Sequence, residues 1–179
     1  DHKKAAYEAV SHLISIGKKD IYLFSMKKDY TYSTLRREGL IEAMKDNGLE
    51  FKRENEILLD ELSIKEAQKH MNIVLNNREV KNIGIFAVSD VIAIGVIKAL
   101  NSKNIKIPQE AAVVGFDNID FSAVIEPSLT TVSQPGYELG VESVKSLMRK
   151  ITGENNNPEK IILDYELIVR ETTNKFVLK

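Results

Sequence analysis

Hydrophobic residues follow two patterns along the chain: short unbroken runs, and longer stretches in which they recur every three or four positions. The first pattern is typical of buried parallel strands and the second of helices with one apolar face. The predicted strands cover residues 21–24, 57–59, 83–88, 112–116, 161–163 and 167–169, with a further extended segment at 128–134. The predicted helices cover residues 3–16, 34–47, 63–75, 90–100 and 135–152.

The regular alternation of strand and helix predicts an α/β fold, with a doubly wound, mostly parallel sheet flanked by helices on both faces. In such sheets ligands bind beyond the carboxyl ends of the strands, so the residues that follow each strand are the candidates for a site. These residues are 25–33, 60–62, 89–90 and 117–118.

The last predicted helix carries an apolar stripe that has no evident partner in this alternation. Its members are Tyr137, Val141, Val144, Met148 and Ile151. Each such side chain left in water would forgo about 1.5–3 kcal/mol. We therefore expect that a further segment, a swapped partner or a second copy of the chain covers this face.

Composition narrows the functional classes. The 179 residues suit one domain or two small ones, and 25 Lys and Arg against 26 Asp and Glu give a net charge of −1. This balance argues against nucleic-acid binding by the bulk charge of these residues. The absence of Cys excludes disulfides, thiolate metal sites and Cys nucleophiles. No apolar run approaches the ~20 residues needed to span a bilayer, so we expect no membrane association.

Polar residues at the predicted strand ends carry the candidate chemistry. The three His have no ligand spacing, and neither a P-loop nor a G-x-S-x-G motif occurs, so we expect no enzyme, no metal and no cofactor. Ser33, Arg36, Asp90 and Asp117 could instead converge on a polyhydroxyl ligand, because a guanidinium donates paired hydrogen bonds and a carboxylate accepts from hydroxyls. Alternatively, Asp90 caps its helix, Arg36 is a solvated helix residue, and Asp117 forms a turn with Asn118.

Four ordered motifs carry a family resemblance. They are FAVSDVIAIG at 86–95, VVGFDN at 113–118, PSLTTVSQP at 127–135 and LIVRETT at 167–173. In this order they resemble the effector-binding domain of LacI/GalR-type bacterial transcription regulators. The opening residues, with Ala5-Ala6, His12-Leu13-Ile14 and Gly17, are similar to the helix that begins the second subdomain of that domain.

The resemblance implies a two-lobed fold like that of the type I periplasmic sugar-binding proteins, with effector bound between the lobes. Residues 1–132 would form a nearly complete C-terminal subdomain, residues 133–158 would belong to the N-terminal subdomain, and residues 159–179 would return to the C-terminal one. The DNA-binding headpiece would lie outside this chain. Because one wall of the cleft would be missing, we expect the isolated chain to bind effector weakly or not at all.

Matched position by position, the resemblance implies effector contacts for Arg36, Asp117, Ser89 and Asp90. Leu62 falls where many members carry an aromatic residue that stacks on the ligand ring, and an aliphatic side chain offers a pyranose a weaker stacking surface. Ser33 is added from its place before the predicted helix.

The function that the resemblance implies is ligand sensing in a cytoplasmic, homodimeric regulator. A small sugar-like effector would control operator DNA binding by the headpiece, and the helix at 63–77 is our candidate for the dimer surface. A periplasmic sugar-binding protein of the same fold is the alternative. An enzyme on a doubly wound sheet is a third, which no nucleophile–base pair supports.

Overall fold

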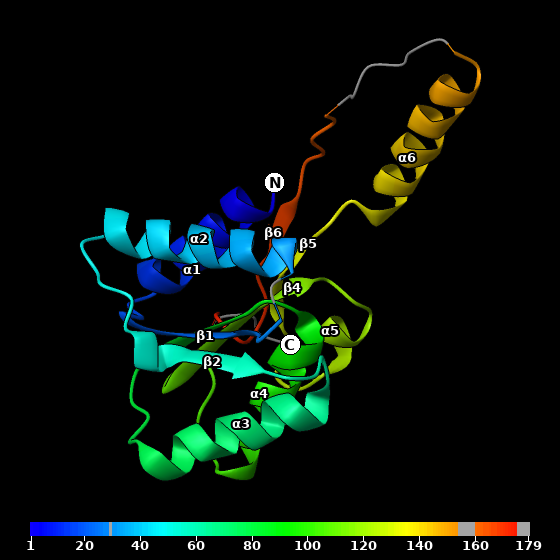
Figure 1. The fold of residues 1–179 in the computed structure, drawn as a ribbon. Helices are drawn as coiled ribbons and strands as arrows, with labels where there is room; N and C mark the ends of the chain where they lie inside the picture. The colour runs from blue at the N-terminus through cyan, green and yellow to red at the C-terminus, as the bar shows by residue number, and fades with distance from the viewer. Residues whose placement is uncertain (29, 154–159, 175–179) are drawn as a thin grey trace.

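A six-stranded sheet lies at the centre of the computed structural model, which describes residues 1–28, 30–153 and 160–174 (Figure 1). The strands are β1 (Asp20–Met26), β2 (Glu56–Leu59), β3 (Ile83–Ala87), β4 (Ala111–Asp117), β5 (Thr130–Ser133) and β6 (Glu166–Ile168). Their order is β2-β1-β3-β4-β5-β6, and all neighbours are parallel except β6, which is antiparallel to β5. The predicted α/β class and the mostly parallel sheet are confirmed.

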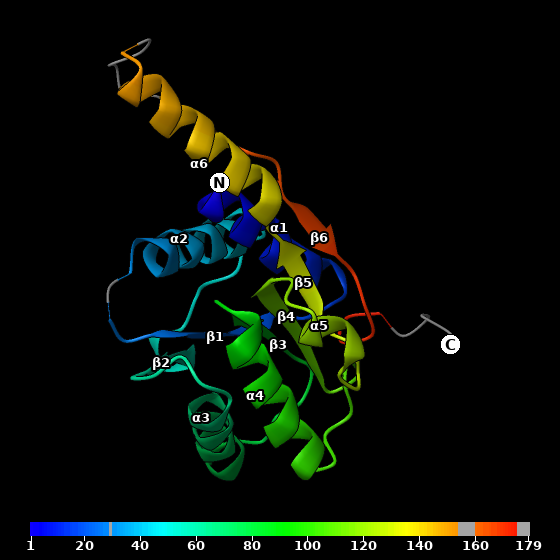
Figure 2. The same cartoon turned by 90° about the vertical axis from the view of Figure 1, so that its right-hand side faces the viewer.

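Helices cover both faces of this sheet (Figures 1 and 2). α1 (His2–Ser15) and α2 (Thr31–Asp46) pack together on one face, and α3 (Ile64–Asn77) and α4 (Asp90–Ser102) pack together on the other. Two short elements complete the body, a 3₁₀ turn at Arg53–Asn55 and α5 (Phe121–Val124). The fold is doubly wound, as the sequence predicts. Among the described residues, no helix has the length and apolar character to cross a membrane.

The strands are buried on both faces, which explains their unbroken apolar runs. Every residue of β3 is buried, and the rings of Phe24, Phe86 and Phe116 fill the interior. The two helices on the far face approach closely at Gly95, where an added Cβ would lie 2.6 Å from the Cβ of Ala67. α3 and α4 therefore pack tightly against each other on this face of the sheet.

Three sequence predictions are wrong in detail. α2 begins at Thr31 rather than at residue 34, so part of the predicted loop is helical. α5 was not predicted, because four residues are too few to show a helical period. Residues 161–163 form no strand; they pair with none of the six strands, and Ile161 and Ile162 are 42% and 58% exposed.

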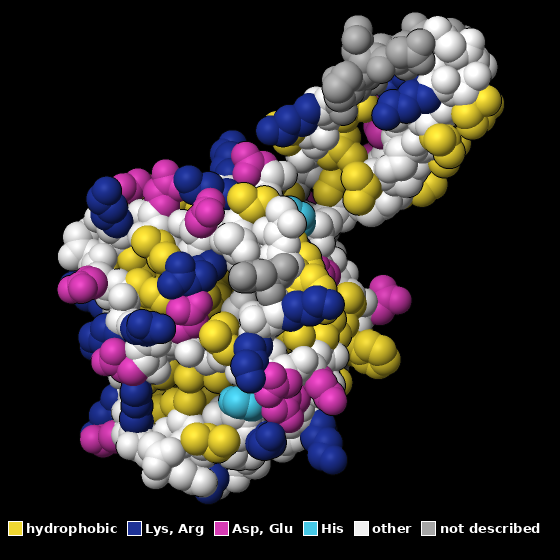
Figure 3. Space-filling model, viewed as in Figure 1, with side chains coloured by type: hydrophobic (Ala, Val, Ile, Leu, Met, Phe, Trp, Pro, Cys, Tyr) yellow, Lys and Arg dark blue, Asp and Glu magenta, His cyan; other side chains and the backbone are white. Residues whose placement is uncertain are grey.

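The last helix, α6 (Gly136–Ile151), stands away from the body and has no buried residue (Figures 1 and 3). Four members of its predicted stripe are more than half exposed: Tyr137 (82%), Val144 (61%), Met148 (51%) and Ile151 (68%). Cover by a segment or chain outside the described residues stays a prediction. The expected boundary between residues 158 and 159 lies outside the described residues.

Candidate functional site

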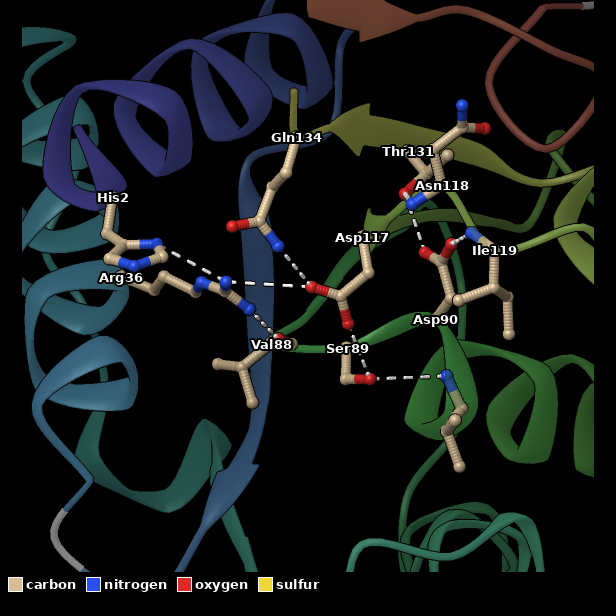
Figure 4. Close-up of polar contacts among 11 residues, drawn as sticks. His2, Arg36, Val88, Ser89, Asp90, Asp117, Asn118, Ile119, Thr131 and Gln134 are labelled. Carbon is tan, nitrogen blue, oxygen red and sulfur yellow. Dashed lines mark hydrogen bonds and ion pairs between the residues drawn. The ribbon is translucent and has the colours of Figure 1, made fainter. Parts of the chain in front are cut away.

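A surface hollow of about 320 Å³ lies at the carboxyl ends of β3 and β4, where the fold class predicts a site. Its lining residues are His2, Tyr32, Arg36, Leu62, Val88, Ser89, Asp117 and Gln134. They come from the starts of α1 and α2, the loop after β2, the ends of β3 and β4, and the residue that follows β5 (Figure 4). Segments far apart in the sequence therefore meet here.

Arg36 is the central cation of this hollow and is almost fully buried, with 3% of its surface exposed. Its guanidinium donates to the carbonyl of Val88, lies 3.3 Å from His2 Nδ1, and forms an ion pair with Asp117 at 3.6 Å (Figure 4). The group also lies over the ring of Phe116, 3.4 Å from its centroid. Burial lowers the pKa of Arg36 to about 10, against the opposing effect of Asp117, so the side chain is charged at neutral pH.

Two tyrosines extend the aromatic surroundings of this arginine. The guanidinium carbon lies 5.0 Å from the ring centroid of Tyr32, and the Tyr30 ring stacks on Tyr32 at 5.4 Å. Arg36 is thus enclosed by rings as well as by polar partners. A planar cation favours such faces, so the guanidinium is held in one orientation before any ligand arrives.

Asp117 ends β4 and faces Arg36 with about 30% of its side chain exposed. Ser89 Oγ donates to Oδ2 at 3.0 Å, and Gln134 Nε2 donates to Oδ1 at 2.7 Å (Figure 4). Burial raises the pKa of Asp117 despite the opposing effects of Arg36 and of these two donors. Because a carboxylate has about four acceptor positions, it can still accept from a ligand hydroxyl.

Asp90 does not line the hollow, although its place at a strand end makes it a candidate. The side chain is fully buried, and it accepts from Thr131 Oγ1 at 2.6 Å and from the backbone N–H of Ile119 at 3.0 Å. Burial raises its pKa to about 6. It does not cap its helix either, since Ser89 Oγ accepts from the N–H of Val91. Asp90 instead supports the backbone that follows Asp117.

Of the other two sequence candidates, one lines the hollow and one does not. Leu62 lines the hollow and is 49% exposed, so it offers an aliphatic surface there. Ser33 is buried in the first turn of α2 and does not line the hollow, and its Oγ has no hydrogen-bond partner among the described residues. Of the six candidates, the structure therefore brings Arg36, Asp117, Ser89 and Leu62 together.

Four lining residues are not among the six sequence candidates: His2, Tyr32, Val88 and Gln134. Gln134 lies within the motif at 127–135, and its place at the end of the predicted extended segment could have marked it. Tyr32 was assigned to a loop because the predicted helix began too late. His2 carried no signal of its own. Within the described part of the chain, no group of three or more His, Cys, Asp or Glu residues is placed to hold a metal ion.

Comparison with known proteins agrees with this architecture. A model of the periplasmic binding protein-like domain matches residues 10–173. The HTH-type transcriptional regulator MalR of Clostridium butyricum is 35% identical over 96% of this chain and 50% of its own length. The chain thus spans about half the length of the curated relatives it matches.

Two solved structures of regulators with bound sugars also match. One is a LacI-family regulator from Enterococcus faecium with bound ribose, which is 28% identical with a TM-score of 0.84 over 96% of this chain and 63% of that one. The other is a complex of the transcriptional regulator CelR with cellobiose, which is 26% identical with a TM-score of 0.89 over 96% and 52%. The chain therefore belongs to the periplasmic binding protein-like domain family, in the form that makes up the effector-binding region of LacI-type transcriptional regulators.

Proposed function

We propose that this chain is the ligand-sensing part of a bacterial transcriptional regulator and that its hollow binds one side of a small, sugar-like effector. The ion pair of Arg36 and Asp117 is the observation that carries the proposal. The guanidinium supplies donors, and the carboxylate supplies acceptors, within reach of a single ligand. Vicinal hydroxyls of a sugar need both a hydrogen-bond donor and a hydrogen-bond acceptor.

The same pair favours an uncharged ligand. The positive charge of Arg36 is already matched by Asp117, so a phosphate in the hollow would compete with the carboxylate. Leu62 adds an aliphatic surface against which the C–H face of a sugar can lie. The ribose in the Enterococcus relative and the cellobiose in the CelR complex agree with this class of ligand.

Calorimetry on the full-length protein tests the proposal with three probes: D-ribose, cellobiose and inorganic phosphate. We expect at least one sugar to bind and Asp117→Asn to weaken that binding by about tenfold or more, because the lost acceptor charge is worth about 1.5–3 kcal/mol. The matched control is Asp120→Asn, which changes an exposed carboxylate three residues away and should bind as the parent protein does. Tight binding of phosphate with no sugar binding would contradict the proposal.

The regulatory half of the proposal rests on segments outside this chain. We infer that residues 1–132 and 159–179 form one lobe, that 133–158 belong to a second lobe, and that effector shifts the population between two lobe arrangements. A headpiece would pass this shift to operator DNA. The 179-residue chain alone should then bind sugars weakly, and micromolar affinity for D-ribose would contradict the two-lobe inference.

We further propose that the regulator works in the cytoplasm as a homodimer, with the outer surface of α3 in the interface. Ile64 and Ile73, both on α3, are 37% and 48% exposed, which leaves apolar surface for a second copy. Sedimentation of the full-length protein should show a dimer that Ile73→Lys weakens. A dimer unchanged by Ile73→Lys would place the interface elsewhere.

A periplasmic sugar-binding protein of the same fold is the second candidate. The relatives named as HTH-type regulators favour the first candidate. The sequence upstream of Asp1 separates the two, because a regulator carries a helix-turn-helix there and a periplasmic protein carries a signal peptide.

A further inference from the structure

A second arginine, Arg170, lies beside the candidate site without lining the hollow. Its Nη2 donates to Asn118 Oδ1 at 2.8 Å, and its Nη1 donates to Ser122 Oγ at 3.0 Å and to the carbonyl of Leu129 at 2.8 Å. Asn118 directly follows Asp117, the carboxylate that faces the hollow. The guanidinium therefore binds Asn118, the residue next to the Asp117 carboxylate that would contact a ligand.

The backbone from which this arginine extends is itself fixed. The N–H of Arg170 donates to Thr130 Oγ1 at 2.8 Å, and the same hydroxyl lies 3.1 Å from the Arg170 carbonyl. On the next residue, Glu171 accepts from the N–H of Ser128 at 2.8 Å. The segment after β6 is thus fastened to the start of β5, and the guanidinium reaches Asn118 from a rigid base.

The backbone at Asp117 and Asn118, which Arg170 holds, needs such support. Asp117 has a φ of 115° and Asn118 a φ of 53°, positive values that few residues other than glycine adopt, although Asp and Asn tolerate them best. Such conformations persist where the surroundings hold them in place. Asn118 Nδ2 donates to Ser133 Oγ at 3.1 Å and the N–H of Ile119 donates to the carboxylate of Asp90, while Arg170 adds a charge-assisted bond to the side chain of Asn118 itself.

We propose that Arg170 is a positioning residue of the effector site. By holding Asn118 in the left-handed conformation, it fixes the carboxylate of Asp117 at the place where Arg36 and a ligand meet it. The inference rests on the proposed ligand role of Asp117, but Arg170 itself touches no ligand. Its contribution is to the geometry of the turn, so it should be visible with and without ligand.

Hydrogen exchange of the ligand-free, full-length protein provides the first test. In Arg170→Lys the charge remains but the forked donor is lost. We expect amides at 118–121 to exchange about tenfold faster, because the loss of a contact between interacting residues makes local opening easier. The amides of β1 and β3 should exchange as in the parent protein. Affinity for D-ribose, measured by calorimetry, should fall by a similar factor.

Arg78→Lys is the matched control. Arg78 also donates to an Asn carbonyl, that of Asn55 at 2.9 Å, and to a hydroxyl, that of Tyr22 at 3.3 Å, but it lies beyond the opposite end of the sheet. It should leave residues 118–121 and sugar affinity unchanged. Equal effects of both substitutions on these readouts would reduce Arg170 to a general stabiliser and overturn the proposal.

Asn118→Gly supplies a rescue. Glycine adopts a positive φ without strain and offers no side chain for Arg170 to hold. In that background Arg170→Lys should change exchange at 118–121 less than twofold, whereas an undiminished effect would contradict the proposal. If D-ribose does not bind the parent protein, the proposed ligand is wrong, and the exchange experiment still decides the role of Arg170.

Discussion

The body of the molecule and the arm that α6 forms away from it both contain an amphipathic helix. The apolar face is buried in the body and exposed in the arm. α3 buries Ala67, Met71 and Val74 against its neighbours, whereas α6 buries no residue. Both helices show apolar residues at three-to-four spacing, so the pattern alone predicts a buried face in each. The difference is that α3 packs on α4 within the described chain, whereas no described segment buries the apolar face of α6.

The arm is nevertheless joined to the candidate site at its N-terminal end, and a residue of the body contacts the same turn. Gln134, before α6, donates to Asp117, and Arg170, after β6, donates to Asn118. Gln134, next to the arm, and Arg170, in the body beyond β6, therefore contact adjacent residues of one turn. A ligand that moves this turn would act on the Gln134 contact and so on the start of the arm, which is a physical route for the population shift that we propose.

The largest expected difference between the two regions comes from a matched pair of methionines. Met71 on α3 is fully buried, and Met148 on α6 is 51% exposed. Met71→Ala should lower the free energy of unfolding by about 2–5 kcal/mol, because it removes buried contacts and leaves a cavity. Met148→Ala in the 179-residue chain should stay within about 0.5 kcal/mol of the parent. Urea unfolding followed by circular dichroism measures both.

The same pair can also locate the missing partner of α6. In the full-length protein, Met148→Ala should become clearly destabilising if another lobe or chain covers the arm. A large cost already present in the 179-residue chain would show that α6 packs on the body, and the comparison between the two regions would fail.

Much of the fold could be predicted because the apolar positions of the body are buried by other elements of the same chain. The unbroken runs at 83–88 and 112–116 are strands since helices cover both of their faces. The start of α2 could not be predicted, because its N-cap position is Tyr30 and no side chain caps the helix. The apolar run at 161–163 lacks a strand partner, and a sequence pattern does not reveal whether one is present.

The candidate site could be predicted only to the level of strand ends. That rule brought Arg36, Ser89 and Asp117 to one hollow, but it does not say which way a side chain points. Asp90 follows a strand end yet turns inward, where the absence of a side chain at Gly115 leaves room for its carboxylate. Burial and direction depend on contacts between distant segments, and these appear only in three dimensions.

The second prediction uses the buried carboxylate of the body. Burial raises the pKa of Asp90 from 3.8 to about 6, so the native state holds this proton more tightly than the unfolded state does. The stability gained from protonation is complete below the unfolded value and is lost as the pH rises through about 6. The difference between the two pKa values corresponds to about 2–3 kcal/mol.

Asp90→Asn should remove this pH dependence. Between about pH 4 and pH 7, its free energy of unfolding should fall about 2–3 kcal/mol less than that of the parent protein. Denaturant titrations at several pH values give both curves. Asp120→Asn, at an exposed position, should follow the parent, and parallel curves for Asp90→Asn and the parent would show that Asp90 does not titrate in this range.

The third prediction concerns how closely helices pack in the body. Gly95 lies in α4 against the backbone of Ile64 and the Cβ of Ala67, so an added methyl group forces α3 and α4 apart. Gly95→Ala should lower the free energy of unfolding by about 1–3 kcal/mol despite the better helix propensity of alanine. Thermal unfolding measures the loss, and an unchanged or raised Tm would mean that the two helices can separate without cost.

The smallest effect, with the opposite sign, is expected at Gly140, the corresponding helical glycine of the arm. No atom lies within 4 Å of a Cβ added there, so Gly140→Ala changes only the helix propensity, by about 0.5–1 kcal/mol in favour of the helix. Because no residue of α6 is buried, this gain should appear as slower hydrogen exchange within 136–151. The unfolding of the body should not change. A rise in the unfolding free energy of the body itself would show that the arm and the body unfold together, and the arm would then be part of one cooperative unit with the sheet that carries the candidate site.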